Sequence, residues 1–199
     1  MSSESGRLTD RGQAFTLEAV LGALIVIAGL VFALQAVTVT PATTGSTAAP
    51  VDVSRLDSVL AEAADSGALK RSVLAWNGGF QGASSGEGYF IDGVPNNDFG
   101  RALDEAVAPS VTMNVIVHYR TGPDTVKEQR MVYNGIPGEG AARAAATVAV
   151  YDGDRLRDST GAPRTGTDVR SAGLYPGLSD RYPSDLYSVL KVEVIAWEA

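Results

Sequence analysis

A long apolar segment near the N-terminus constrains this chain more than any other feature of its sequence. Residues 15–39 form a run of 25 residues in which Glu18 is the sole charged residue. As a helix rising about 1.5 Å per residue, the run would be about 37 Å long, whereas a bilayer core is about 30 Å thick. It is apolar on every side, unlike the amphipathic helix of a globular core. We therefore predict a transmembrane helix within residues 13–40.

The residues that flank this segment predict its orientation. Arg7 and Arg11 precede it, and no Lys or Arg follows until Arg55. Because cytoplasmic flanks are enriched in basic residues, we expect a single-pass protein of the cell membrane, with its N-terminus in the cytoplasm and residues 51–199 outside. A cleaved secretory signal is the alternative, although its apolar region is normally about 7–15 residues long.

The choice of charged residues indicates a salt-adapted surface. The chain of 199 residues has 16 Lys and Arg against 23 Asp and Glu, which gives a net charge of −7. Lysine occurs at Lys70, Lys127 and Lys191 alone, and Asp outnumbers Glu. Such a surface resembles that of proteins from salt-loving archaea, and a GC-rich genome is the alternative explanation. The negative net charge opposes nucleic-acid binding, which needs a basic face.

Few residues of the chain suggest catalytic chemistry. Cysteine is absent, and His118 is the single histidine, which excludes thiolate metal sites and disulfides. We interpret His118 as a solvent-facing strand residue. Residues 152–154, Asp-Gly-Asp, lack the ligand spacing of an EF-hand and are interpreted as a solvated acidic turn. The Gly-rich residues 77–86 lack the Lys of a phosphate loop. We therefore expect no enzyme activity, no cofactor and no metal.

The rest of the chain predicts a small α+β domain. An uncharged Thr/Ala/Pro-rich linker at residues 41–50 precedes residues 51–199, whose periodicity alternates between helix and strand. Helices are expected within residues 52–76, with Ser54 as a cap and an interruption at residues 65–67, and at Asp98–Val107. Strands are expected at Val111–Arg120, Thr125–Tyr133, Ala145–Tyr151 and Val189–Trp197. The expected architecture is an antiparallel sheet of about four strands with helices packed on one face.

Residues 152–185 interrupt this pattern. They are rich in Gly, Pro, Asp and Arg, which predicts a long irregular connection or a lid. Three tyrosines lie within or beside it, Tyr175, Tyr182 and Tyr187. We interpret them as anchors packed on the sheet, with an exposed contact surface as the alternative.

The junction before the apolar segment, Arg11-Gly12-Gln13-Ala14-Phe15-Thr16-Leu17-Glu18, resembles a type IV prepilin (class III) signal. Phe15-Thr16-Leu17 followed by Glu18 is similar to the start of bacterial pilins, and Arg11-Gly12-Gln13 is similar to the cleavage junction of haloarchaeal archaellins. The resemblance implies that residues 1–12 are a cytoplasmic leader, which prepilin peptidase removes after Gly12. A cut after Gln13 is the alternative, because it would restore the glutamate spacing of bacterial pilins.

The same resemblance implies roles for residues of the helix. In pilins the new N-terminal amine of one subunit pairs with the glutamate of its neighbour, here Glu18, whose charge would otherwise be costly in lipid. Gly22, Gly29 and Ala36 recur every seven residues and would allow close packing of helices, with ordinary lipid-facing composition as the alternative.

The sequence as a whole predicts a membrane-anchored type IV pilin-like protein, a minor pilin or pseudopilin, on the surface of a haloarchaeon. Its expected partners are the membrane, prepilin peptidase and other pilin-like subunits. The alternative is a single-pass extracellular binding domain that does not polymerise.

Overall fold

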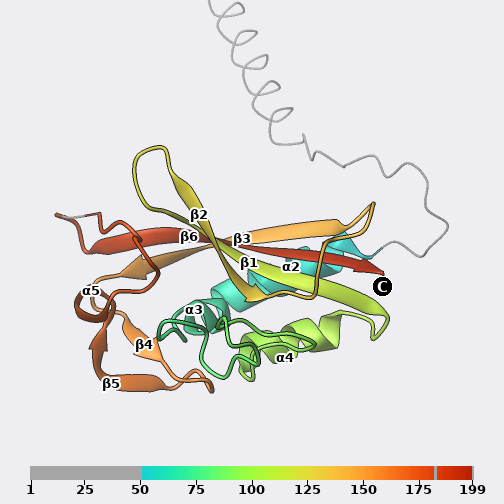
Figure 1. The fold of residues 1–199 in the computed structure, drawn as a ribbon, viewed down its shortest axis with the longest axis horizontal. Coiled ribbons are helices and arrows are strands. Elements are labelled where there is room, and N and C mark those ends of the chain that lie inside the picture. Colours follow the sequence, from blue (N-terminus) through green and yellow to red (C-terminus); the bar gives the residue numbers. More distant parts are fainter. Residues whose placement is uncertain (1–50, 182, 199) are drawn as a thin grey trace, which may run out of the picture. The chain divides into compact units, whose positions relative to one another are not determined.

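The computed structural model describes residues 51–181 and 183–198, which we call the head (Figure 1). Its helices are α2 (Val53–Asp65), α3 (Ala68–Val73), α4 (Asp98–Ala106) and α5 (Val169–Ala172). Its strands are β1 (Val111–Arg120), β2 (Val126–Val132), β3 (Ala142–Tyr151), β4 (Arg155–Arg157), β5 (Pro163–Asp168) and β6 (Leu186–Glu198). The α+β class is confirmed.

The predicted leader, transmembrane helix and linker lie outside the described residues. Within residues 51–181 and 183–198, no helix is long and apolar enough to cross a membrane.

The first helical region divides in two where the sequence predicts a stop. α2 begins after Asp52, whose carboxylate accepts the backbone N–H groups of Ser54 at 3.0 Å and Arg55 at 3.3 Å. The prediction that Ser54 is the cap is therefore wrong, because the Asp52 side chain already satisfies these free N–H groups. α2 and α3 are separated at Gly67, whose φ of 72° lies in the left-handed region that glycine adopts without steric cost.

The main sheet has the strand order β2-β1-β6-β3, with all neighbours antiparallel. β1 and β2 form a hairpin, and β6 inserts between β1 and β3. β3 starts at Ala142, three residues before the predicted start, because it continues its pairing as far as Ala196 of β6. Since β2 and β3 lie at opposite borders of the sheet, the loop at residues 133–141 crosses from one to the other.

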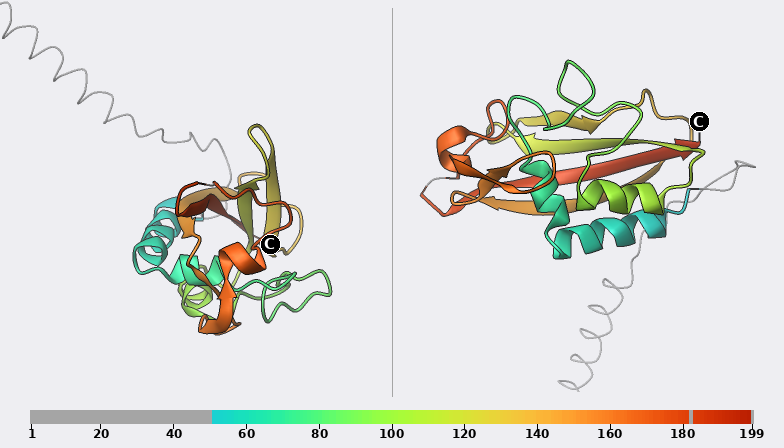
Figure 2. Two further views of the ribbon diagram at one scale, coloured as in Figure 1. Left: turned by 90° about the vertical axis from the view of Figure 1, so that its left-hand side faces the viewer. Right: turned by 90° about the horizontal axis from the view of Figure 1, so that it is seen from below.

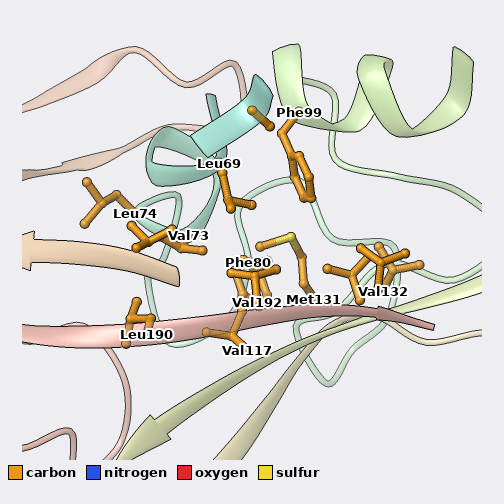
Figure 3. Packing of buried hydrophobic residues seen from close by; sticks show 14 of the residues in the cluster. Leu69, Val73, Leu74, Phe80, Phe99, Val117, Met131, Val132, Leu190 and Val192 are labelled. Atoms are coloured by element: carbon orange, nitrogen blue, oxygen red, sulfur yellow. The ribbon is translucent and has the colours of Figure 1, made fainter. Parts of the chain in front are cut away.

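The helices α2, α3 and α4 cover one face of this sheet (Figure 2). Figure 3 shows the packing of the core at its centre, where Leu69 of α3 and Phe99 of α4 lie over Met131 and Val117 of the sheet. All four side chains are fully buried. The predicted packing of helices on one face is confirmed.

The prediction of an irregular connection over residues 152–185 is wrong in part. β4 and β5 form a small two-stranded sheet within it, and α5 follows directly. These strands lack apolar alternation, so their pairing depends on contacts from elsewhere in the chain. Leu156 of β4 is buried in the core, and the Arg157 N–H donates to the Leu74 carbonyl at 2.8 Å.

Candidate functional site

The residues that the prepilin resemblance implicates all precede the head. The cleavage junction Arg11, Gly12 and Gln13, the carboxylate of Glu18, and the helix-packing residues Gly22, Gly29 and Ala36 lie outside the described residues. Their roles stay predictions.

A network of ionisable side chains crosses the sheet face that carries no helices. His118 Nε2 lies 2.9 Å from Glu193 Oε2, and His118 Nδ1 lies 3.4 Å from Glu128 Oε1. Arg143 and Lys191 each place a nitrogen 3.7 Å from Glu193 Oε1. Cross-strand register explains this arrangement, because Glu128 pairs directly with His118 and Glu193 lies on the next strand. The network therefore links all four strands through side chains.

The arrangement of His118 suits hydrogen bonding to carboxylates better than metal binding. Its two ring nitrogens face different carboxylates, so the three side chains do not converge on one point as metal ligands must. Within the head no group of three or more His, Asp and Glu side chains is placed to hold a metal ion. His118 is on the predicted polar face, but its side chain is just 17% exposed because it lies between the two glutamates.

The Asp-Gly-Asp turn at residues 152–154 is tied down by cations, so its interpretation as a solvated acidic turn is wrong. Asp152 Oδ2 lies 3.0 Å from a nitrogen of Arg170. Asp154 Oδ2 lies 2.6 Å from Lys70 Nζ and also accepts the Tyr151 N–H at 2.7 Å. The two carboxylates hold the turn against α5 and α3 respectively.

An aromatic cluster joins residues that are distant in sequence. The ring of Tyr175 lies 4.9 Å from that of Trp76 and 5.2 Å from that of Tyr119. The Tyr175 hydroxyl donates to the Val73 carbonyl at 2.8 Å, and burial raises the pKa of this hydroxyl well above its ordinary range. Tyr187 is also buried. The anchor interpretation is confirmed for Tyr175 and Tyr187, and Tyr182 lies outside the described residues.

The crossing loop after β2 is held by the buried side-chain amide of Asn114 on β1. Asn114 is 1% exposed. Its Nδ2 donates to the Gly135 carbonyl at 2.9 Å, and its Oδ1 accepts the Asn134 N–H at 2.8 Å. Asn134 Nδ2 donates in turn to the Met113 carbonyl at 2.8 Å. Asn114 is a polar residue between apolar neighbours on β1, and this is the sequence signal for a buried amide. The loop that it binds could not be predicted, because Asn134 is 20 residues away in the chain.

Next to this loop lies a cavity of about 470 Å³ with two carboxylates, those of Asp92 and Asp104, beside an apolar wall that includes Val107 and Met113. Asp92 has a φ of 54°, in the left-handed region, and its N–H donates to Asn134 Oδ1 at 2.8 Å. The hydrogen bond explains why the loop holds this conformation. No local sequence pattern indicates this cavity, because α4, β1 and the loop before α4 form it together.

Comparison with known proteins identifies a family but no activity. The family model described as a family of unknown function (DUF7288) matches residues 11–196. No curated protein and no solved structure matches the chain. The matched range includes both the apolar segment and almost the whole head.

Proposed function

The chain belongs to the DUF7288 family of unknown function, and we propose that it is a type IV pilin-like surface protein, a minor pilin or pseudopilin of a haloarchaeon. The observation that carries this proposal is the junction at residues 11–18 directly before 25 residues with one charge. The role is structural: the apolar helix anchors and packs, and the head is displayed outside the cell membrane.

Two features support the proposal beside the junction. The family match runs from Arg11 through the apolar segment to residue 196, so the segment and the head form one unit of the family. The head is an α+β domain with a closed core, which suits a part displayed at the end of an anchored helix.

The physical role of Glu18 follows from its position at the edge of the apolar segment. An ionised carboxylate in a membrane helix costs about 2–3 kcal/mol unless it has a partner. Processing after Gly12 would create a positive amine on Gln13, and the amine of one subunit would neutralise Glu18 of the next. Gly22, Gly29 and Ala36 would let the helices approach closely enough for van der Waals packing.

The surface of the head fits a salt-rich exterior. Exposed carboxylates lie on several elements, including Asp57 and Glu62 of α2 and Asp104 and Glu105 of α4. Exposed lysine is rare. The chain has three lysines, of which Lys127 and Lys191 are exposed and Lys70 is ion-paired with Asp154 and partly buried. A surface of this kind keeps a protein soluble through strongly hydrated carboxylates.

The decisive experiment is mass spectrometry of the N-terminal peptide of the full chain, isolated from native membranes with and without prepilin peptidase. We expect a mature start at Gln13 that disappears without the peptidase. An intact start at Met1 or Ser2 in both strains would contradict the proposal and leave the non-polymerising, membrane-anchored binding domain. A start near Pro50 would indicate a secreted protein.

A second experiment tests assembly with a matched pair of variants. Glu18→Gln removes the carboxylate expected to pair between subunits, whereas Glu4→Gln changes a residue of the leader that processing removes. We expect Glu18→Gln to lose the protein from sheared extracellular filaments and Glu4→Gln to retain it. Equal amounts in the filament fraction would contradict the pairing role of Glu18.

A further inference from the structure

A cavity of about 450 Å³ lies at one end of the sheet, lined by Arg120, Gly122, Pro123, Ser179, Arg181 and Ser188. These residues come from the end of β1 and the turn after it, and from the start of β6 and the segment before it; both regions lie at the same end of the sheet (Figure 1). The volume is within the range of about 300–1,000 Å³ of small-molecule sites. None of these lining residues is acidic, although the chain carries a net charge of −7.

The two arginines of this cavity differ from most of the other arginines of the head. Carboxylates pair with four of these others, namely Arg71, Arg101, Arg143 and Arg170. Backbone carbonyls accept from Arg55, Arg157 and Arg164. The guanidinium groups of Arg120 and Arg181 have no ion pair, hydrogen bond or ring contact within residues 51–181 and 183–198. Two unpaired cations therefore line one cavity of an acidic protein.

Ser188 supplies an independent observation at the same place. It is 3% exposed, and its hydroxyl has no hydrogen-bond partner in the described part of the chain. Because Ser188 lines the cavity, its hydroxyl is available to donate to a ligand oxygen there.

We propose that this cavity binds a sulfate or phosphate group. Guanidinium groups donate paired hydrogen bonds to such oxygens, and hydroxyls add single ones. Arg120 and Arg181 together carry two positive charges, which match a doubly charged tetrahedral anion better than a singly charged carboxylate. The space beside the anion accommodates the molecule to which it is esterified, so a free anion and a sulfate or phosphate ester share this chemistry.

Calorimetric titration of the full chain at constant ionic strength tests the chemical class. The probes are inorganic sulfate, inorganic phosphate and acetate, and constant ionic strength keeps general charge screening equal. We expect saturable binding of sulfate or phosphate at least about tenfold tighter than that of acetate, a difference of about 1.4 kcal/mol. Absence of saturable binding, or equal binding of acetate, would overturn the proposal.

Matched arginine variants test the location. Arg120→Gln and Arg181→Gln each remove a charged donor and should weaken binding about tenfold, since a hydrogen bond to a charged group contributes about 1.5–3 kcal/mol. Arg143→Gln is the control, because Arg143 is an exposed arginine that pairs with Glu193 and lies outside the cavity lining. Equal weakening by all three variants would show nonspecific attraction and overturn the site.

Ser188→Ala separates binding from folding. The substitution removes a hydroxyl that has no hydrogen-bond partner within the head, so we expect unchanged unfolding stability and binding weakened severalfold. Unchanged binding would remove Ser188 from the site and overturn the proposal as stated.

Titration with glucose 6-sulfate and glucose 6-phosphate then distinguishes the two sources of the anion. Tighter binding than the inorganic anion assigns an ester as ligand, and equal binding assigns the free anion; both support the site. None of these titrations depends on processing at Gly12, so failure of this site and failure of the pilin-like role are distinguishable.

Discussion

The two faces of the main sheet are built from alternate residues of the same strands, yet they are stabilised differently. On β1, Met113, Val115 and Val117 face the helices and are buried. Asn114 and His118 occupy alternate positions of the strand and point to the opposite face. The face packed against the helices, the covered face, gains stability from apolar burial at about 25 cal/mol per Å². On the opposite, open face, exposed ion pairs contribute about 0–1 kcal/mol each. Most of the stability therefore comes from the covered face, and side chains of the open face are available for contacts.

The largest effect on the covered face is expected from Gly100→Ala in α4. A Cβ at this position would lie 1.8 Å from the Pro95 carbonyl oxygen, so α4 could not keep its place. We expect a loss of about 3 kcal/mol or more in the free energy of unfolding, because overpacking displaces the backbone. Urea unfolding followed by circular dichroism measures it. Gly86→Ala, where a Cβ meets nothing within 4 Å, is the control and should be nearly neutral.

Truncation of one side chain on each face tests directly whether the covered face contributes more stability than the open face. Leu69→Ala on α3 removes a fully buried side chain and should cost about 2–5 kcal/mol, from lost burial and the cavity left behind. Thr147→Ala, at an exposed position of β3 on the open face, should change stability by less than about 0.5 kcal/mol. Equal losses in urea unfolding would contradict the assignment of stability to the covered face.

Asn114→Ala tests the one end of the open face that a loop covers. The substitution leaves the Asn134 N–H and the Gly135 carbonyl without their partner, which should cost about 1–3 kcal/mol. Hydrogen exchange should rise first in residues 134–141. The exposed Asn77→Ala is the control, and protection of the loop that survives Asn114→Ala would show that other contacts hold it.

A buried tyrosine makes the covered side sensitive to alkali. The pKa of Tyr175 is raised in the folded state by burial, while in the unfolded state it is about 10. The resulting stability is present below pH 10 and is lost as the pH rises above that value, because the unfolded chain ionises first. Tyr175→Phe should cost about 1 kcal/mol at pH 7, through its lost hydrogen bond, and reduce the alkaline decline. Urea midpoints at pH 7 and pH 11 measure both effects. Tyr133→Phe keeps Tyr175 and should retain the wild-type decline.

Regular strands and amphipathic helices were predictable, because each repeats a local pattern. The bounds of β1 are those expected from alternation, and α4 ends one residue before the predicted Val107. By contrast, β4 and β5 show no repeated alternation of apolar and polar residues. Leu156 of β4 is nevertheless buried, and the N–H of its neighbour Arg157 donates to the distant Leu74 carbonyl. Asp and Ser are both good helix caps, so residue type could not decide between Asp52 and Ser54. The backbone geometry decides it, because α2 begins at Val53 and Asp52 precedes it.

The functional features divide in the same way. The junction at residues 11–18 and the apolar segment are contiguous, so the sequence alone predicts processing and anchoring. Arg120, Arg181 and Ser188 are separated by up to 68 positions, and nothing local distinguishes these arginines from the others. Whether an arginine finds a carboxylate depends on strand register and loop paths, which long-range pairing sets.

By itself, then, the sequence determined the apolar segment, the negative net charge and the α+β class, because hydropathy, charge and periodicity are properties of neighbouring residues. The tertiary structure alone decided that β6 inserts between β1 and β3, that Asn114 is buried under a crossing loop, and that Arg120 and Arg181 share a cavity. The physical reason is that burial and pairing depend on which distant segments meet, and free energy gained across the whole core selects that arrangement.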